Sequence, residues 1–380
     1  VTPIKTAYWN HTPLLLVTPQ AANKTMGQGG FQEVEQMNLF KDMVCYQEEV
    51  RDPSRMAEVL NRVIEKAIRG SAPAQINVPR DYWTQVVDIE LPPIVRFERQ
   101  GGGKEAIDKA AKLLSDAKFP VILSGAGVVI GDAIKECKEL AEKLDAPVCN
   151  GYQHNDSFPG SHPLAVGPLG YNGSKAAMQL ISKADVVLAL GTRLNPFSTL
   201  PGYGIDYWPK KANIIQVDMN PDRIGLTKKV TVGIAGDAKQ VAKQILDKLS
   251  SNAGDKGREE RKNLIHQTKS AWLQTLTSLD HEDDDPGTVW NKEARERDKD
   301  RMSPRQAWRA IQAAMPEDAI ISSDIGNNCA IGNAYPTFEK PRKYLAPGLF
   351  GPCGYGFPSI LGAKICCPNT PLIGFAGDGA

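Results

Sequence analysis

The chain has 380 residues, which at about 150 residues per domain predicts two to three domains. This length is greater than that of a single binding module. Its 45 Lys and Arg residues against 44 Asp and Glu leave a net charge of +1, so charge gives no argument for a nucleic-acid or anionic-membrane partner. Hydrophobic residues at 41% and charged residues at 23% are typical of globular proteins and exclude a chain that is disordered throughout.

No apolar run reaches the roughly 18 residues needed to span a bilayer, and residues 1–10 lack the basic-then-apolar order of a secretory signal. The seven cysteines are an odd number without C-x-x-C spacing, which favours reduced thiols over a disulfide framework or a zinc site. We therefore expect a cytoplasmic location.

Short runs that are apolar on both faces recur along the chain and alternate with segments of helical period. Such runs predict buried strands of parallel sheets covered by helices on both faces, the doubly wound α/β class. They occupy residues 14–17, 76–78, 121–123, 186–190, 214–217, 320–321 and 372–375.

Several helices between these strands carry start and stop signals. Ser54 is placed to cap a helix whose apolar face runs over residues 56–68, and Gly70 to end it. Residues 106–117 and 134–144 repeat the pattern. Ser303 followed by Pro304 is typical of a capped helix start and predicts the beginning of a domain.

Two stretches interrupt the alternation. Residues 90–103 contain two adjacent prolines and three adjacent glycines, and residues 250–301 are long and charged. The acidic cluster at 281–287 lacks the alternating ligand spacing of a calcium loop, which favours a solvated surface. We place domains at 1–97, 98–255 and 303–380, with a charged linker at 256–302.

Residues 124–131 form a glycine-rich turn between a predicted strand and a predicted helix. Their G-x-G-x-x-x-G spacing has the third glycine one position late for a dinucleotide fingerprint. A nicotinamide site therefore stays open here beside the alternative, a tight turn into the helix.

The strand predicted at 372–375 is followed by Gly377, Asp378 and Gly379. At the carboxyl edge of an α/β sheet, glycines let the backbone approach phosphate oxygens, and a carboxylate can bind the Mg²⁺ that bridges them. An ordinary turn is the alternative for this tripeptide alone.

The tripeptide follows two further segments, 321–328 and 351–358, in an order and spacing that resemble the thiamine-diphosphate enzymes of the acetolactate synthase and pyruvate oxidase superfamily. The resemblance implies thiamine diphosphate and Mg²⁺ as cofactors, with Asp378 as a metal ligand between Gly377 and Gly379. It implies that Gly326, Asn327 and Asn328 face the diphosphate. Cys353 takes the place of the side chain that supports the bent cofactor, where relatives often have Met or Leu.

The resemblance extends to the earlier regions. Residues 1–97 look like the later part of a pyrimidine-binding domain, 98–255 like a central domain and 303–380 like the first part of a diphosphate-binding domain. The terminal domains are thus expected to be incomplete, with the catalytic Glu and the second metal ligand outside the chain and the chain inactive by itself. The family implies a homodimer or homotetramer.

In relatives, the residues matching Phe31 and Gln32 lie at the active site; a buried anchor and a surface amide are the alternative. Residues 20–33, 170–175 and 191–197 look most like those of family members that cleave sulfoacetaldehyde with phosphate to acetyl phosphate and sulfite. Both anions favour cationic partners, so Arg193 is a candidate active-site residue, followed by Lys175 and then by His154 and Asn155.

Three rival functions stay open. The nearest is acetolactate synthase or another carboligase or decarboxylase that acts on pyruvate. The second is a nicotinamide-dependent dehydrogenase built on the turn at 125–131. The third is a flavin- or nucleotide-binding module, since the central domain of some relatives holds FAD.

Overall fold

The computed structural model describes residues 1–93, 97–278 and 302–378. It divides into two compact units, which are described separately: Val1–Glu98 with Pro347–Pro352, and Arg99–Ala346 with Cys353–Ala380. No helix among the described residues is both long enough and apolar enough to cross a membrane.

The N-terminal unit contains a parallel sheet of order β1-β3-β2, formed by β1 (Leu14–Gln20), β2 (Tyr46–Glu49) and β3 (Pro73–Pro79). Helix α3 (Met56–Gly70) packs Val59, Val63 and Ala67 against one face, where β3 contributes alternate apolar residues. On the other face, the helices α1 (Thr2–Trp9) and α2 (Gln36–Phe40) enclose a small second cluster.

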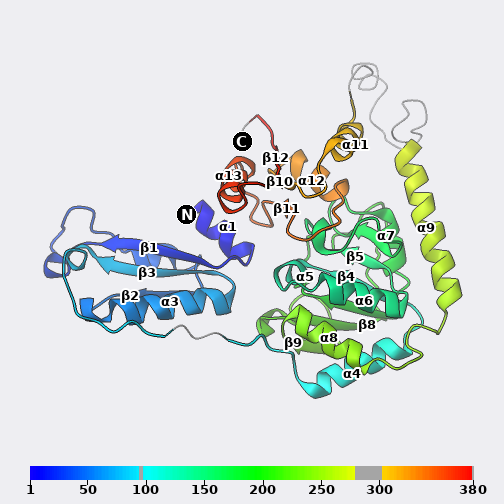
Figure 1. Ribbon diagram of the computed structural model, residues 1–380, viewed down its shortest axis with the longest axis horizontal. Coiled ribbons are helices and arrows are strands. Elements are labelled where there is room, and N and C mark those ends of the chain that lie inside the picture. The colour runs from blue at the N-terminus through cyan, green and yellow to red at the C-terminus, as the bar shows by residue number, and fades with distance from the viewer. Residues whose placement is uncertain (94–96, 279–301, 379–380) are drawn as a thin grey trace. The chain divides into compact units, whose positions relative to one another are not determined.

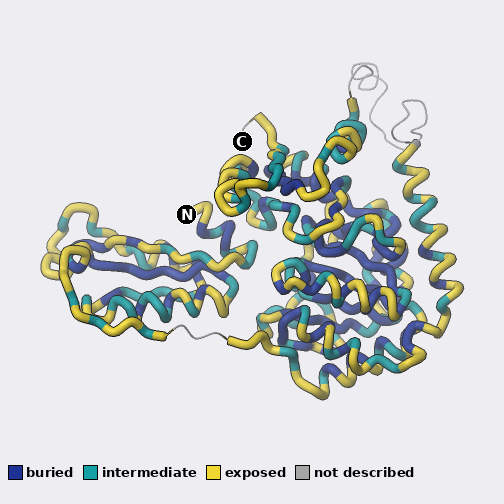
Figure 2. Tube along the Cα trace, in the orientation of Figure 1, coloured by how far each residue is buried: buried dark blue, intermediate teal, exposed yellow. Residues whose placement is uncertain are grey.

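The second unit is built on a six-stranded parallel sheet of order β6-β5-β4-β7-β8-β9 (Figure 1). Its strands are buried because helices cover them, as Figure 2 shows. The strands are β4 (Pro120–Ser124), β5 (Val148–Asn150), β6 (Ala165–Pro168), β7 (Val186–Leu190), β8 (Asn213–Asp218) and β9 (Val232–Ala235). The helices are α4 (Lys104–Asp116), α5 (Ala126–Ile130), α6 (Ile134–Leu144), α7 (Lys175–Ile181), α8 (Ala238–Lys248) and α9 (Arg258–Ser278).

The same unit contains a three-stranded parallel sheet of order β11-β10-β12. Its strands are β10 (Ile320–Ser323), β11 (Tyr344–Leu345) and β12 (Leu372–Phe375), and its helices are α11 (Pro304–Ala314), α12 (Asn327–Ala334) and α13 (Gly356–Cys366). Ser303 caps α11 in a capping box with Gln306, as the sequence predicts.

The prediction of an α/β fold with parallel sheets is confirmed. The predicted cap at Ser54 is wrong: the Asp52 side chain instead accepts from the Ser54 N–H and caps a short 3₁₀ turn, Pro53–Arg55, that precedes α3. Gly70 is the last residue of α3, and Ser71 takes the left-handed conformation after it. The stretch expected to be a charged linker begins with the helix α9, and its acidic cluster at 281–287 lies outside the described residues.

Candidate functional site

Three loops meet at the carboxyl edge of the β11-β10-β12 sheet. Strands β10 and β12 are parallel neighbours with Ser323 opposite Phe375, so the segments that follow them leave the same edge. A Cβ added to Gly377 would lie 3.4 Å from the Asn328 Nδ2, and one added to Gly356 would lie 3.4 Å from the Cβ atoms of Asp324 and Ala376. The structure therefore brings together the segments 324–328, 354–356 and 376–378. The resemblance assigns residues of the first segment to the diphosphate and Asp378 of the third to the metal, and the second segment directly follows Cys353.

Asp324 ties two of these loops together. Its buried carboxylate accepts hydrogen bonds from the backbone N–H groups of Gly354 (3.2 Å), Tyr355 (3.4 Å) and Gly356 (3.2 Å). This holds the loop that carries Cys353 against the end of β10. Sequence reasoning assigned no role to Asp324, although an acidic residue directly after a buried strand is a usable signal.

The backbone at this edge fits a polyanionic group. Gly326 (φ 84°), just before α12, and Gly354 (φ 80°) both have left-handed backbones, and a Cβ added to either would meet nothing within 4 Å. The N-terminus of α12 offers backbone N–H groups to an anion, and Asn327 there is exposed.

The metal end of the site has a suitable ligand. The Asp378 carboxylate is exposed in the turn after β12 and can supply an oxygen to a divalent cation; Gly379 lies outside the described residues. No group of three or more His, Cys, Asp or Glu gathers among the described residues to hold a metal. A Mg²⁺ that takes one or two protein ligands and the cofactor's own phosphate oxygens fits this donor set. Cys353 is exposed beside these loops.

The glycine-rich turn at 125–131 has a different role. A Cβ added to Gly127 would lie 2.6 Å from the Cα of Gly191, and one added to Gly125 would lie 2.6 Å from the Gly191 carbonyl oxygen. The Gly127 N–H donates to that oxygen at 2.8 Å. These glycines let two backbones touch, which supports the tight-turn interpretation and leaves the nicotinamide hypothesis without its main argument.

Arg193 is half-buried after β7, at the carboxyl edge of the central sheet. Burial lowers the pKa of His154 to about 4, with a smaller contribution from the positive charge of Arg193. Arg193 also opposes the burial that raises the pKa of Asp218. Asn155, one of the weaker anion-binding candidates, is buried instead and donates to the carbonyls of Asn333 and Pro336.

Phe31 and Gln32 belong to the N-terminal unit, whereas Arg193 and Asp378 belong to the second. Phe31 is 78% exposed, so the interpretation of this residue as a buried anchor is wrong, and Gln32 is exposed as well. Glu33 fixes the loop by accepting from the N–H groups of Gly27 (2.6 Å) and Gly30 (3.0 Å), which lowers the pKa of its carboxyl group.

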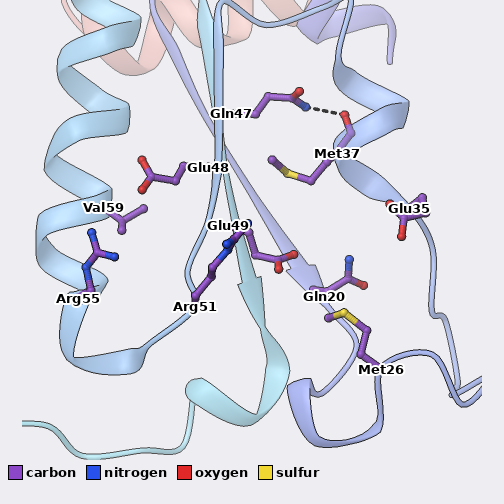
Figure 3. A pocket seen from close by; sticks show the side chains of 10 residues that line it. All are labelled: Gln20, Met26, Glu35, Met37, Gln47, Glu48, Glu49, Arg51, Arg55 and Val59. Carbon is purple, nitrogen blue, oxygen red and sulfur yellow. Dashed lines mark hydrogen bonds between the residues drawn. The ribbon is translucent and has the colours of Figure 1, made fainter.

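The N-terminal unit also has a cavity of about 470 Å³ at the carboxyl ends of β1 and β2 (Figure 3). Gln20, Glu49 and Arg51 line it where these strands end, and Gln47 donates to the Met37 carbonyl at 2.7 Å. Beside it, the buried amide of Asn77 donates to Glu49 at 2.8 Å. Sequence reasoning missed this cavity, although polar residues at strand ends were a signal for it.

Comparison with known proteins agrees with this geometry. Residues 107–245 match the family "Thiamine pyrophosphate enzyme, central domain", and residues 324–380 match "Thiamine pyrophosphate enzyme, C-terminal TPP binding domain". The chain therefore belongs to the thiamine pyrophosphate enzymes, and the domain matches indicate thiamine diphosphate as its cofactor.

Individual proteins of known name differ in how similar their sequences are to this chain. The whole chain is 79% identical to a probable sulfoacetaldehyde acetyltransferase of Rhizobium meliloti and 78% identical to a sulfoacetaldehyde acetyltransferase of Roseovarius nubinhibens. It is 31% identical to a probable acetolactate synthase large subunit of Methanocaldococcus jannaschii. The chain spans 64%, 63% and 63% of the lengths of these three proteins, respectively.

Proposed function

We propose that the complete protein is a thiamine-diphosphate-dependent acyltransferase that converts sulfoacetaldehyde and phosphate to acetyl phosphate and sulfite, a step in taurine and sulfonate degradation. The observation that carries the proposal is the meeting of the loops 324–328, 354–356 and 376–378 at one sheet edge. The high identity to sulfoacetaldehyde acetyltransferases over the whole chain favours this substrate over pyruvate.

The roles follow from the chemistry of each segment. Gly326, Asn327 and Asn328 offer N–H and amide groups to the diphosphate. Asp378, which stands between Gly377 and Gly379 in the sequence, holds Mg²⁺. Cys353 would support the cofactor. When bound, thiamine diphosphate supplies the carbanion that side chains cannot form at neutral pH.

The part of the site that binds substrate requires groups that bind two anions, sulfonate and phosphate. Phe31 and Gln32 are proposed to line it from the N-terminal unit, and Arg193 to bind sulfonate or phosphate from the central domain. Replacing Arg193 by Ala is expected to raise the KM for one of these substrates in the complete protein. Unchanged kinetics would remove Arg193 from the site. A cytoplasmic homodimer or homotetramer is proposed with this activity.

The decisive assay supplies the complete protein with sulfoacetaldehyde and phosphate, with thiamine diphosphate and Mg²⁺ added or withheld. We expect sulfite and acetyl phosphate in equal amounts only when both cofactors are present. Pyruvate serves as the competing substrate. Release of carbon dioxide and a hydroxy-keto acid from pyruvate, without sulfite from sulfoacetaldehyde, would instead identify a carboligase like the acetolactate synthases.

A further inference from the structure

Helix α12 presents two different faces. Gly326 and Asn327 at its start are exposed and Asn328 is half-buried, whereas Cys329 and Asn333 are buried. Cys329 and Asn333 are four residues apart, so they lie on the same side of the helix. The side that does not meet the proposed diphosphate therefore packs against protein, and in the second unit that protein is the central domain (Figure 1).

Asn333 is a hydrogen-bonding hub near the end of α12. Its Oδ1 accepts from the backbone N–H of Gln153 at 2.8 Å, and its Nδ2 donates to the Tyr171 carbonyl at 2.9 Å. Its own carbonyl accepts from the Asn155 Nδ2 at 3.0 Å, and the same amide donates to the Pro336 carbonyl at 2.8 Å. Two loops of the central domain thus hold the last turn of the helix.

The first turn of α12 is held from the same loop. The Cys329 thiol lies 2.9 Å from the Tyr152 hydroxyl and also contacts the Gln153 side-chain amide. Residues 151–157 therefore contact α12 near both of its ends on one face. The contact at Cys329 is two residues from Asn327.

This loop has a firm base. The Gly151 N–H donates to the Ser124 carbonyl at 2.7 Å, and the Ser124 hydroxyl donates to the Ser157 carbonyl at 3.0 Å. Asn150 adds a bond to the Ser157 hydroxyl at 3.0 Å. Because Ser124 is the last residue of the central strand β4, this loop connects α12 to the core of the central sheet.

We propose that Asn333 and Asn155 are positioning residues that set α12 from the central domain, so that the helix N-terminus meets the cofactor diphosphate. The inference rests on the proposed function, since it assumes that thiamine diphosphate binds at this helix. It makes cofactor affinity a property of the contact between two domains and not of the binding loops alone.

The test replaces Asn333 by Ala in the complete protein. Calorimetry at saturating Mg²⁺ is expected to show a roughly tenfold rise in the Kd for thiamine diphosphate, the size seen when groups that orient ligands are removed. The kcat at saturating cofactor should stay within about twofold, because no group near the reacting atoms has changed. Hydrogen exchange of the 327–330 amides in the cofactor-free protein should accelerate.

Glu339→Gln is the matched control. The Glu339 carboxylate joins the same two domains by accepting from the Ser161 N–H (2.9 Å) and hydroxyl (2.7 Å), but it is exposed and follows the end of α12 by five residues. Its Kd for thiamine diphosphate should equal that of the wild type. If Asn333→Ala does not fold, Asn155→Ala decides, because the Asn155 side chain donates to the Asn333 carbonyl and can be removed without changing the sequence of α12.

The outcomes separate the two proposals. A wild-type protein that binds no thiamine diphosphate overturns the proposed function and this inference together. A wild type that binds, with a folded variant that has a lower melting temperature but an unchanged Kd, overturns only the inference. A raised Kd with an unchanged kcat, confined to the Asn333 and Asn155 variants, supports it.

Discussion

Two glycine-rich turns follow buried parallel strands in the same unit, yet their surroundings differ. After β4, a Cβ added to Gly127 would lie 2.6 Å from the Gly191 Cα. After β10, a Cβ added to Gly326 would meet nothing within 4 Å, and the same holds for Gly354 beside it. The central turn is filled by the protein's own backbone, whereas the C-terminal turn leaves its backbone approachable.

The difference shows that glycine spacing by itself does not mark a phosphate site. A glycine is needed wherever two backbones touch and wherever a backbone meets a ligand. The neighbouring side chains distinguish the two cases. Asn328 and the exposed Asp378 accompany the open turn, whereas the 125–127 turn is closed by Gly191 and Thr192.

The largest effect is expected from Asp378→Ala. Removing the carboxylate should weaken Mg²⁺-dependent binding of thiamine diphosphate by roughly 100-fold, about 3 kcal/mol, since a metal ligand is lost. The melting temperature of the cofactor-free protein should not change, because Asp378 is exposed. Calorimetry measures the affinity. Asp318→Ala, at another exposed aspartate, is the control, and equal affinities for the two variants would reject Asp378 as a ligand.

The next effect separates the two turns directly. Gly127→Ala should destabilise the protein by about 1–3 kcal/mol through overpacking against Gly191, with no change in cofactor affinity. Gly326→Ala has room for its methyl group, but its φ of 84° and ψ of −145° are essentially restricted to glycine, so it should cost about 1–3 kcal/mol of strain and also weaken cofactor binding. Thermal unfolding and calorimetry measure both quantities. Loss of cofactor affinity in Gly127→Ala, at unchanged stability, would reverse the assignment.

The sequence predicts well what depends on local chemistry. Buried parallel strands such as Val186–Leu190 are apolar on both faces, and the Ser303 cap lies three residues from Gln306, which completes it. The role of Asp378 as a metal ligand stays a prediction, because it rests on the order of three segments that resembles a known family and not on the tripeptide alone.

What the sequence did not reveal depends on distant contacts. Asn333 receives its bond from Gln153, 180 residues earlier, and Asp324 binds N–H groups 30 to 32 residues later. The turn at Gly127 is closed by Gly191 through the folded sheet. The Ser54 prediction failed for a local reason: the Asp52 carboxylate accepts from the Ser54 N–H and hydroxyl, so Ser54 lies within the short 3₁₀ turn before α3 and does not cap the helix.

Two carboxylates differ in burial in the same way as the two glycine-rich turns. Asp156 in the central domain is buried and accepts from the N–H groups of Lys343 (3.1 Å) and Tyr344 (3.4 Å), whereas Asp378 is exposed. Burial raises the pKa of Asp156 to about 6 from 3.8. The folded state therefore prefers the protonated form, and the stability that Asp156 contributes below pH 3.8 is lost as the pH rises through about 6.

Asp156→Asn keeps an acceptor but cannot ionise. Its stability relative to the wild type should rise between pH 4 and pH 7 by about 2 kcal/mol, because the wild-type protein loses the stability of its protonated carboxyl group over this range. Melting temperatures across this range measure the effect. His154→Gln should have the opposite pH dependence, with its stability relative to the wild type rising as the pH falls. Burial lowers the pKa of His154 to about 4 from 6.5, so the stability that the neutral imidazole contributes to the wild type is lost as the pH falls through that value. A pH-independent difference for Asp156→Asn would contradict the argument.

The smallest effect concerns the open site itself, at Cys353. Relatives are expected to have a larger Met or Leu under the cofactor, so Cys353→Met should add apolar contact and tighten thiamine diphosphate binding about threefold, less than 1 kcal/mol. Calorimetry again measures the Kd, and Cys366→Met, at another exposed cysteine on α13, should leave it unchanged. Because the neighbouring Gly354 has open space around it, the larger side chain should fit without loss of stability. Weaker binding by Cys353→Met would mean that the smaller thiol leaves room that the cofactor or substrate itself uses, and that this edge is less open than its glycines indicate.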